Sequence, residues 1–456
     1  MQKYDVIVIG SGSGLDVANA AAASDLRVAL IEKGPLGGTC LNRGCIPSKI
    51  IIHSADVAMA IRRAADFGLR VKGVEVDFAS ITARASKLVD GDSEGIEHAL
   101  THHIKNPHLI KGEAKFVGKK TLRVGAQELK ADRILIAAGT RPHVPDIPGL
   151  REAGYITSDE ALRLQVQPKE LIILGGGYIA AELGHFFGAL GTHVTVVHRR
   201  PVLLRQEDAD VADKFTEVFG RYHTVMTETL PVEVRREADR IVLTVEHRLS
   251  GRRSEVAGDA LLVATGRTPN TDMLNLDATG VKVDDRGFVR VKETLETDVK
   301  GIYALGDVVG RYLYKHNANH EAQYAYWNMV LGREIPVDYS VMPHAVFSYP
   351  QVAGVGLTEQ ECKAQGIDYA VGRYEYADTG MGTALQETDG FVKILARRSD
   401  SKILGCHIIG PEASTLIQEA VVAMKSGEGT VKNILNSIHV HPALPEVLSR
   451  AAAALQ

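Results

Sequence analysis

Residues 4–15 read YDVIVIGSGSGL, an apolar run followed by alternating glycines at Gly10, Gly12 and Gly14. The apolar run has the character of a β-strand that is buried on both faces of a sheet. An alanine-rich stretch at 18–23 then predicts a helix, and a second apolar strand at 27–31 leads to Glu32. This order predicts a dinucleotide-binding βαβ unit, with the glycine turn at a pyrophosphate and Glu32 at a ribose diol.

The glycine turn departs from the full Rossmann fingerprint at one position. The pattern GxGxxG requires a third glycine at position 15, where the sequence has Leu15. That glycine allows the helix to pack closely on the strand. We therefore expect the helix to stand slightly further from the strand, or to begin at a shifted position.

A second copy of the fingerprint, ELIILGGGYIA from residue 170, satisfies the pattern in full at Gly175, Gly177 and Ala180. The next strand, 192–197, leads into His198-Arg199-Arg200 and has no acid at its end. An acid at this place selects NAD, whereas arginine accommodates the 2′-phosphate of NADP. Arg199 and Arg200 therefore favour NADP(H) over NAD(H), although two arginines after a strand are also typical of a solvated turn.

Two cysteines follow the first βαβ unit, in the run GGTCLNRGCIPSK at 37–49. Four residues separate Cys40 from Cys45, and we expect one turn of helix to bring the two sulfurs within disulfide range. A thiol pair beside a nucleotide fold indicates electron transfer between a nicotinamide and sulfur. The alternatives are two buried small side chains or half of a zinc site. The other cysteines, Cys362 and Cys406, stand alone, so no metal site is predicted.

The size and charge of the chain exclude several classes of protein. With 456 residues the chain is too long for one core, so we expect several domains. A formal net charge of −4 argues against a nucleic-acid binder and against a basic membrane-surface protein. The apolar stretches are shorter than the roughly 20 residues that span a bilayer, and the start lacks a signal peptide's cleavage region. Four cysteines do not make a secreted disulfide framework, so we expect a cytoplasmic protein.

Three further strands carry candidate cofactor contacts. The strands at 133–140 and 260–267 contain Gly139 and Gly266, and we assign both strands to the first fold, at crossings of the chain between nucleotide domains. The strand at 298–307 delivers Gly306 and Asp307 to a carboxyl end, where ligands bind in open α/β sheets. We expect Asp307 to bind a cofactor hydroxyl, the alternative being a cap for the next helix.

From about residue 339 the pattern changes to strands and helices without a glycine fingerprint, which is typical of an α+β domain used for assembly. Near its end, the run HPALPE places His441 five residues before Glu446, and Pro445 is suited to begin a helix. A carboxylate beside an imidazole orients the ring and raises its basicity for proton transfer. Most histidines are surface or core residues, so the pair alone leaves the role open.

These motifs, in this order, resemble the FAD-dependent pyridine nucleotide-disulfide oxidoreductases over essentially the whole chain. The resemblance implies an α/β fold with two Rossmann-like nucleotide-binding domains, for FAD and NAD(P), and a C-terminal α+β dimerisation domain. The implied boundaries are 1–150 for the first part of the FAD domain, 151–270 for the NAD(P) domain, 271–338 for the second FAD part, and 339–456 for the dimerisation domain.

The resemblance also implies a role for each candidate residue. Cys40 would attack the substrate disulfide, and Cys45 would lie against the flavin as a thiolate. His441, with Glu446 behind it, would serve the active site of the other subunit of a homodimer. The implied FAD contacts are Gly10, Gly12, Gly14, Glu32, Gly38, Thr39, Lys49, Gly139, Gly306 and Asp307. The implied NAD(P)-side residues are Gly175, Gly177, Ala180, Glu182, Arg199, Arg200 and Gly266, with Glu182 paired to Lys49.

The implied reaction moves electrons between NAD(P)H and a small disulfide or dithiol, as in dihydrolipoamide dehydrogenases and mycothione reductases. The tail after residue 447 has no cysteine pair, which disfavours mercuric reductases and large thioredoxin reductases. The alternatives are a flavin-containing redox sensor and a subunit of a lipoyl-dependent multienzyme complex. The intact cysteine pair and His441–Glu446 argue against the sensor.

Overall fold

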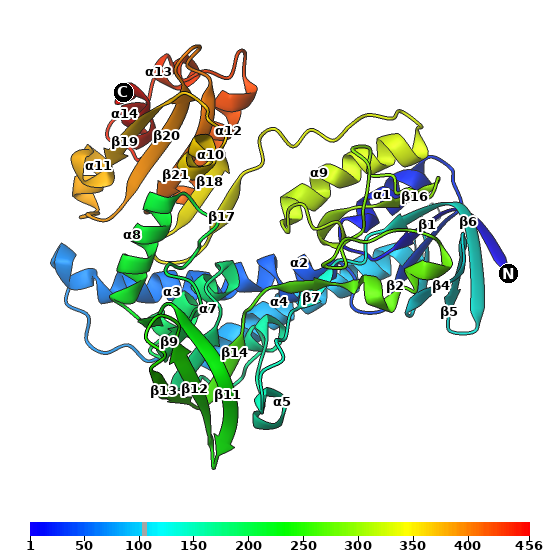
Figure 1. Ribbon diagram of the computed structural model, residues 1–456, viewed down its shortest axis with the longest axis horizontal. Helices are drawn as coiled ribbons and strands as arrows, with labels where there is room; N and C mark the ends of the chain where they lie inside the picture. The colour runs from blue at the N-terminus through cyan, green and yellow to red at the C-terminus, as the bar shows by residue number, and fades with distance from the viewer. Residues whose placement is uncertain (103–106) are drawn as a thin grey trace. The chain divides into compact units, whose positions relative to one another are not determined.

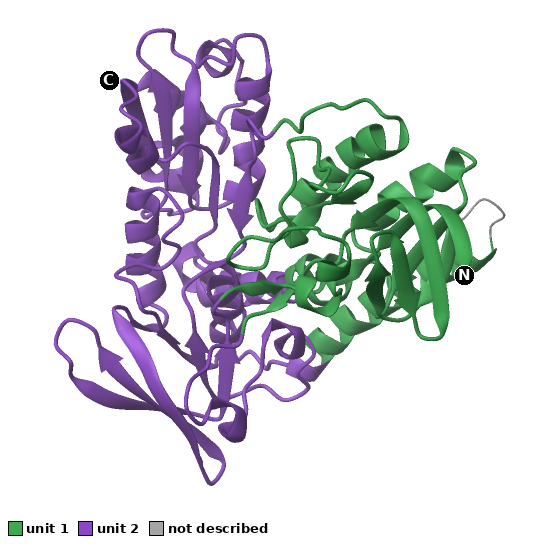
Figure 2. Ribbon diagram, turned by 45° about the vertical axis from the view of Figure 1, so that its right-hand side comes forward, with its two compact units in different colours: residues 1–50, 80–143, 266–338 green, residues 51–79, 144–265, 339–456 purple. Residues whose placement is uncertain are grey.

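The computed structural model describes residues 1–102 and 107–456. The chain divides into two compact units, and each unit joins segments from distant parts of the sequence (Figure 2). Unit 1 contains residues 1–50, 80–143 and 266–338, and unit 2 contains residues 51–79, 144–265 and 339–456.

Unit 1 is built on one sheet with the strand order β3-β2-β1-β6-β5-β4, in which β16 also pairs with β6 (Figure 1). β1, β2, β3, β6 and β16 run parallel, and β4 and β5 are antiparallel additions. The strands are β1 (Gln2–Ile9), β2 (Val28–Glu32), β3 (His108–Lys111), β4 (Ala114–Gly118), β5 (Thr121–Val124), β6 (Gln127–Ile136) and β16 (Ile302–Ala304). Val6, Ile7 and Val8 are fully buried, which confirms the doubly covered first strand.

The helices that lie wholly or partly in unit 1 are α1 (Gly14–Ala23), α2 (Gly38–Arg43), α3 (Cys45–Arg62), α4 (Phe78–His102), η2 (Asn270–Met273), η3 (Leu276–Ala278), η4 (Gly306–Val308), α9 (Lys315–Ala325) and η5 (Tyr326–Val330). α3 continues into unit 2, and α4 begins two residues before unit 1 resumes at residue 80. The run Gly38–Arg62 is long and apolar enough to cross a membrane by length and mean hydropathy alone. Ile51, Ile52, Ala55 and Met59 on α3 are nevertheless buried, as they are in a core helix of a folded protein.

The first helix begins at Gly14, one residue before the missing glycine of the fingerprint. A Cβ atom at Gly14 would lie 2.9 Å from the side chains of both Val8 and Ala137. Gly14 therefore provides the close helix-to-strand approach that Leu15 cannot provide. Of the two sequence-based expectations, the shifted start is confirmed.

Unit 2 contains a second parallel sheet, with the order β10-β9-β8-β14, and a separate antiparallel sheet, β11-β12-β13. The strands are β8 (Glu170–Leu174), β9 (His193–Val197), β10 (Thr224–Met226), β11 (Thr229–Glu237), β12 (Arg240–His247), β13 (Arg253–Gly258) and β14 (Ala260–Val263). The helices are η1 (Ala64–Phe67), α5 (Leu150–Ala153), α6 (Ser158–Ala161), α7 (Tyr178–Ala189) and α8 (Ala209–Gly220). The glycine fingerprint thus joins β8 to α7, as predicted.

The assignment of residues 260–267 to the first fold is wrong. β14 pairs in parallel with β8, so this strand completes the second sheet. An apolar strand with a small-residue end has no feature of its own that selects one of two similar parallel sheets. The predicted chain crossing is confirmed directly after it, because β7 (Thr140–Pro142) and β15 (Arg267–Pro269) pair as the ribbon through which the chain leaves and re-enters unit 1.

The C-terminal part of unit 2 is an antiparallel sheet with the order β17-β18-β21-β20-β19. Its elements are β17 (His344–Val346), β18 (Val352–Gly356), α10 (Glu359–Ala364), β19 (Tyr369–Glu375), η6 (Tyr376–Asp378), α11 (Gly380–Ala384), β20 (Phe391–Arg397), β21 (Ile403–Ile409), α12 (Ala413–Lys425), α13 (Lys432–Leu435) and α14 (Glu446–Ala453). α12 and α14 bury one face against the strands. This architecture confirms the predicted α+β domain and the helix after Pro445.

A buried ion cluster joins α8 to the C-terminal sheet. Lys393 on β20 is 1% exposed and donates to Asp208 at 2.9 Å, to Asp210 at 2.8 Å and to Glu359. Asp208 is fully buried and also accepts the backbone N–H of Glu359 at 2.9 Å. These hydrogen bonds raise the pKa of Lys393 against the lowering effect of its burial, so the ammonium stays charged. The cluster therefore depends on one buried cation.

We expect Lys393→Met to reduce the free energy of unfolding by about 3–5 kcal/mol, because it leaves the Asp208 carboxylate buried without its cation. Lys363→Met is the matched control, since Lys363 pairs with Glu359 from a side chain that is 64% exposed. An exposed pair of this kind contributes about 0–1 kcal/mol. Urea denaturation measures both values, and equal losses for the two variants would contradict the importance assigned to the buried cluster.

Candidate functional site

The two cysteines lie on different helices that meet at Gly44. Cys40 is in α2, Cys45 begins α3, and Gly44 has a non-helical backbone (φ −141°, ψ −119°). A continuous helix would place residues five apart about 140° from each other around its axis, so the predicted single turn of helix is wrong. The break brings the two thiols into hydrogen-bond contact. A Cβ atom at Gly44 would lie 2.9 Å from the Thr39 carbonyl oxygen, so the close approach requires glycine.

The protonation of Cys40 depends on its contact with Cys45. Both cysteines are free thiols; Cys40 is half-buried and Cys45 is exposed. The hydrogen bond from Cys45 and burial raise the pKa of Cys40, and the charge of Lys315 opposes this rise. The reactive form of a thiol is the thiolate, so one proton has to leave the pair before either sulfur attacks a disulfide. A base that accepts this proton is therefore part of the chemistry.

The glycine turn of unit 1 packs its backbone closely against neighbouring backbone. Gly10 has φ +103°, and a Cβ atom there would overlap the Ala137 carbonyl oxygen. Gly38 approaches Gly12 so closely that a Cβ on Gly38 would lie 2.6 Å from the Gly12 Cα. The turn lies at the start of α1, where N–H groups and the helix dipole attract anions. Thr39, half-buried on α2, lies next to Gly38.

Glu32 lies at the end of β2 and faces the glycine turn. One carboxylate oxygen accepts the Ser11 N–H at 2.9 Å and the Ser11 hydroxyl at 2.8 Å, and the other accepts the Gly34 N–H at 2.8 Å. These bonds fix the carboxylate beside the turn. The position agrees with the acid that binds an adenosine ribose in a Rossmann unit.

A second acid is held at the carboxyl end of β16. Asp307 accepts a hydrogen bond of 2.9 Å from the Thr140 hydroxyl, and that hydroxyl in turn accepts from Arg267 at 2.6 Å. Burial raises the pKa of Asp307, and Arg267 and Thr140 oppose the rise. Gly306, with φ +73°, donates its N–H to the buried Glu321 of α9. Gly139 (φ +64°) directly precedes Thr140. Both strands of the crossing ribbon, β7 with Thr140 and β15 with Arg267, therefore supply the hydrogen-bond chain that ends at Asp307.

The second glycine turn repeats the first in detail. Gly175 has φ +130°, and a Cβ there would overlap the Ala264 carbonyl oxygen, as at Gly10 and Ala137. Gly10 donates to Ile31 at 2.9 Å, and Gly175 donates to Val197 at 3.1 Å. Because Glu32 follows Ile31, His198 occupies the place of the acid.

The residues around His198 are basic. The His198 ring packs against Gly176, where a Cβ would be 2.6 Å from the ring, and its Nε2 is buried without a hydrogen-bond partner among the described residues. Burial lowers the pKa of His198. Across the described chain, neither the Arg199 nor the Arg200 guanidinium makes a hydrogen bond or ion pair. Both are available to a ligand.

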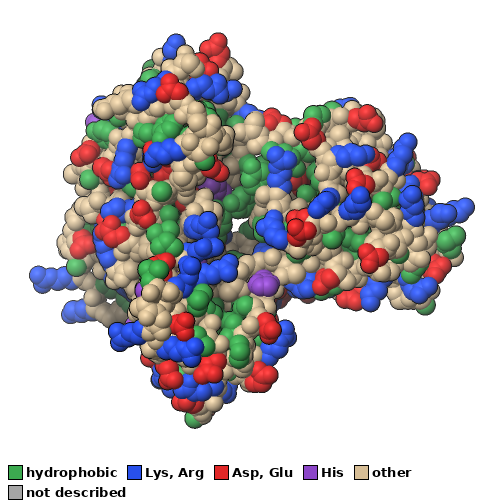
Figure 3. Space-filling model, viewed as in Figure 1, with side chains coloured by type: hydrophobic (Ala, Val, Ile, Leu, Met, Phe, Trp, Pro, Cys, Tyr) green, Lys and Arg blue, Asp and Glu red, His purple; other side chains and the backbone are tan. Residues whose placement is uncertain are grey.

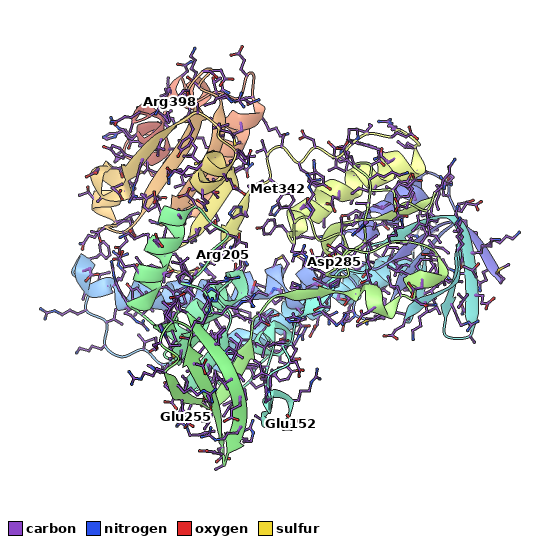
Figure 4. The ribbon with its side chains drawn as sticks, viewed as in Figure 1. Glu152, Arg205, Glu255, Asp285, Met342 and Arg398 are labelled. Carbon is purple, nitrogen blue, oxygen red and sulfur yellow. The ribbon has the colours of Figure 1, made fainter. Side chains whose placement is uncertain are left out.

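Sequence reasoning missed a third arginine, Arg205. The Leu204 N–H donates to the Gly176 carbonyl at 2.7 Å, so the loop after β9 folds back onto the glycine turn and carries Arg205 with it. Lys and Arg side chains gather on the surface around Arg205 (Figures 3 and 4). The signal was present in the run HRRPVLLR, but a loop's return to the turn is not visible in sequence spacing.

His441 and Glu446 form the predicted pair. His441 Nδ1 lies 2.9 Å from Glu446 Oε1, and the other carboxylate oxygen accepts the Ala443 N–H at 3.1 Å. The hydrogen bond with His441 lowers the pKa of Glu446. The imidazole side chain is 74% exposed, whereas the carboxylate is only 13% exposed. The carboxylate therefore orients the ring through Nδ1. The other ring nitrogen, Nε2, does not contact Glu446 and belongs to an exposed side chain.

The structure distributes the other candidates between the two units. Lys49 lies one helical turn after Cys45 on α3, so the two side chains share a face. Glu182 on α7 accepts the Phe347 N–H at 3.1 Å in unit 2. Ala180 is buried on α7, and Gly177 is its N-cap. Gly266 lies on the crossing ribbon of unit 1, where its carbonyl accepts from His143. The pairing of Lys49 with Glu182 stays a prediction.

Comparisons with known proteins agree over the whole chain. The profile of the pyridine nucleotide-disulphide oxidoreductases matches residues 4–324, and the profile of their dimerisation domain matches residues 342–452. A mycothione reductase of Mycobacterium tuberculosis is 36% identical over 100% of both chains. A dihydrolipoyl dehydrogenase of Chlamydia pneumoniae is 35% identical over 99% of this chain and 96% of its own. The solved structure of RclA, an HOCl-induced flavoprotein disulfide reductase of Escherichia coli, has 27% identity, a TM-score of 0.88 and 99% coverage of both chains.

Proposed function

The chain belongs to the pyridine nucleotide-disulphide oxidoreductase family, and we propose that it reduces a small disulfide with electrons from NADPH. The family is FAD-dependent, uses a pyridine nucleotide and exchanges electrons with a thiol pair. The single observation that favours NADPH is the replacement of the ribose-binding acid by His198, followed by Arg199 and Arg200 with free guanidinium groups.

The first glycine turn and its two acids fit FAD. The bare backbone at Gly10, Gly12 and Gly38 suits a pyrophosphate, Glu32 suits a ribose and Asp307 suits a ribityl hydroxyl. Gly14, Gly139, Gly306 and Thr39 complete this proposed site, with Lys49 beside the thiol pair. When bound, FAD converts the transfer of a hydride into dithiol chemistry. The chain's own residues bind the cofactor and carry out thiol exchange.

We propose that Cys40 is the attacking thiol. Its thiolate bonds to one sulfur of the substrate disulfide, and the other sulfur leaves as a thiolate that takes up a proton. The Cys45 thiolate then bonds to Cys40, and the bond between Cys40 and the substrate breaks. The second product leaves as a thiolate and takes up from solvent a proton equivalent to the one that Cys45 lost, and Cys40 and Cys45 remain as a disulfide. His441 accepts the proton of Cys40 and returns it to the leaving sulfur, with Glu446 orienting the ring.

The dimerisation domain points to a homodimer. We propose that His441 and Glu446 act at the active site of the other subunit. In one chain Ile438 is fully exposed and Val440 is 76% exposed, so apolar side chains beside His441 lack a cover. Such a surface is typical of a protein–protein contact. The predicted domain boundaries and a cytoplasmic location are part of the same proposal.

The substrate is tested by one panel of lipoamide, glutathione disulfide and mycothione, each with NADPH and NADH. We expect the highest kcat/KM for a small disulfide with NADPH, and among the three we favour mycothione. Fastest turnover of lipoamide with NADH would instead support a dihydrolipoyl dehydrogenase, the second candidate, which the 35% identity to such an enzyme favours.

Replacing both Arg199 and Arg200 with alanine should lower the ratio of kcat/KM for NADPH to that for NADH by about 10- to 100-fold, since hydrogen bonds to a charged phosphate are lost. Steady-state kinetics with both nucleotides measures this ratio. Replacing Arg252 and Arg253 on the β12–β13 hairpin removes the same charge and should leave the ratio unchanged. A wild-type preference for NADH would overturn the proposed cofactor.

A further inference from the structure

Helix α9 is tied to the first glycine turn by two of its side chains. The Lys315 ammonium donates to the Ser13 hydroxyl at 2.9 Å, and that hydroxyl donates to Asn319 Oδ1 at 2.9 Å. Lys315 and Asn319 are four residues apart and share one face of the helix. α1 and α9 lie side by side in unit 1 (Figure 1). A cation from a distant part of the sequence thus reaches the turn that precedes α1.

The position of α9 is also fixed at the end of β16. Glu321 is fully buried and accepts the Gly306 N–H and, at 3.0 Å, the Asn317 side-chain amide. Gly306 immediately precedes Asp307, so one helix is anchored at both proposed cofactor contacts of this unit. Lys315, as the first residue of α9, is partly buried and its ammonium contacts the Ser13 hydroxyl of the turn.

We propose that Lys315 is a further FAD-binding residue, whose ammonium group pairs with the pyrophosphate of the cofactor at the Gly10–Gly14 turn. The inference rests on the proposed role of this turn in FAD binding. Ser13 is the N-cap of α1, and its side chain caps no N–H of the helix. The turn therefore offers only partial positive charge from backbone groups. Lys315 adds a full charge there, and a phosphate oxygen would replace the Ser13 hydroxyl as its main partner.

The positive charge of Lys315 also acts electrostatically on the thiol of Cys40. Hydrogen bonding to Cys45 and burial raise the pKa of Cys40, and Lys315 is the cation that lowers it. Removing Lys315 should therefore move thiolate formation in the reduced enzyme to higher pH. A lysine with only a structural role would change stability without moving this titration.

The test is the affinity of the apoprotein for FAD, measured by calorimetry. We expect the dissociation constant to rise about 10- to 100-fold in Lys315→Met, because a charge-assisted contact is lost, and to change little in Lys315→Arg. The matched control is Lys130→Met, which removes an exposed lysine of the same unit. ADP carries the same diphosphate without a flavin, so its affinity should fall in parallel. Thermal unfolding of each apoprotein shows whether the variant is folded.

Three results would overturn the inference. The first is an unchanged FAD affinity in a folded Lys315→Met protein. The second is an equal loss in Lys130→Met. The third is a loss for FAD with unchanged ADP affinity, which would place the ammonium at the flavin ring instead of the pyrophosphate. Failure of the wild-type protein to bind FAD would overturn the proposed function itself, so the two failures are distinguishable.

Discussion

Cys45→Ser should bind FAD normally but lose disulfide turnover by on the order of 10³-fold or more, because the bond that expels the second product can no longer form. The long-wavelength absorbance expected from the Cys45 thiolate against the flavin should disappear with it. Stopped-flow spectra after mixing with NADPH, together with steady-state turnover of the best disulfide, measure both effects. An unchanged spectrum and unchanged turnover would reject the role of Cys45.

Cys40→Ser is the informative companion variant. It removes the attacking sulfur, so turnover should fall as far, but it leaves the Cys45 thiolate in place, so the long-wavelength absorbance should remain. Cys362→Ala serves as the control for loss of a thiol in general, because Cys362 is fully buried in a different part of the chain. If Cys40→Ser and Cys45→Ser lost the same absorbance, the distinct roles of the two sulfurs would be wrong.

His441→Gln should slow the exchange of thiol and disulfide by about 10²–10⁴-fold, the usual contribution of a general acid–base group. Glutamine keeps a polar side chain of similar size but cannot take up the proton of Cys40. Reduction of the enzyme by NADPH does not need this proton transfer and should stay within a small factor of the wild-type rate. Rapid-reaction kinetics separates the two half-reactions, and equal slowing of both would argue against the acid–base role.

His439→Gln is the matched control for His441. The His439 ring also contacts a glutamate, with Nε2 2.8 Å from Glu419, but its side chain is only 11% exposed, so it cannot present a free nitrogen. We expect its exchange rate to remain close to that of the wild type. A loss as large as that of His441→Gln would show that the effect comes from the fold of this segment.

The contact with His441 also has a pH consequence. It lowers the pKa of Glu446, so the carboxylate stays ionised as the pH falls to the ordinary range of glutamate. A lowered folded-state pKa stabilises the folded protein above the pKa of the unfolded chain, and this stabilisation is lost as the pH drops further. Glu446 should therefore add no step to the pH profile of thiol exchange above about pH 5.

Patterns that are local in sequence were sufficient for much of the fold. The buried strands at 4–9 and 170–174 and the helix that begins at Glu446 follow from side-chain character and proline placement, and the structure has all three. Gly14 shows a limit of pattern matching, because its packing on Val8 and Ala137 replaces a glycine that the fingerprint places one residue later.

Features that depend on local backbone geometry or on distant segments could not be predicted from the spacing of residues. The break at Gly44 that joins Cys40 to Cys45 depends on a backbone approach to Thr39. The pairing of β14 with β8 depends on which of two similar sheets has an open edge. The contact of Lys315 with Ser13 joins residues 302 positions apart, and no spacing rule relates them.

The central claim is that electrons pass from NADPH through bound FAD to the Cys40–Cys45 pair. Anaerobic titration of the purified oxidised protein with NADPH, followed by absorbance and thiol counting, tests it most directly. We predict that the first equivalent produces two new thiols per subunit and the long-wavelength thiolate absorbance while the flavin remains oxidised. Bleaching of the flavin by the first equivalent without new thiols, or a purified protein that binds no flavin, would contradict the account.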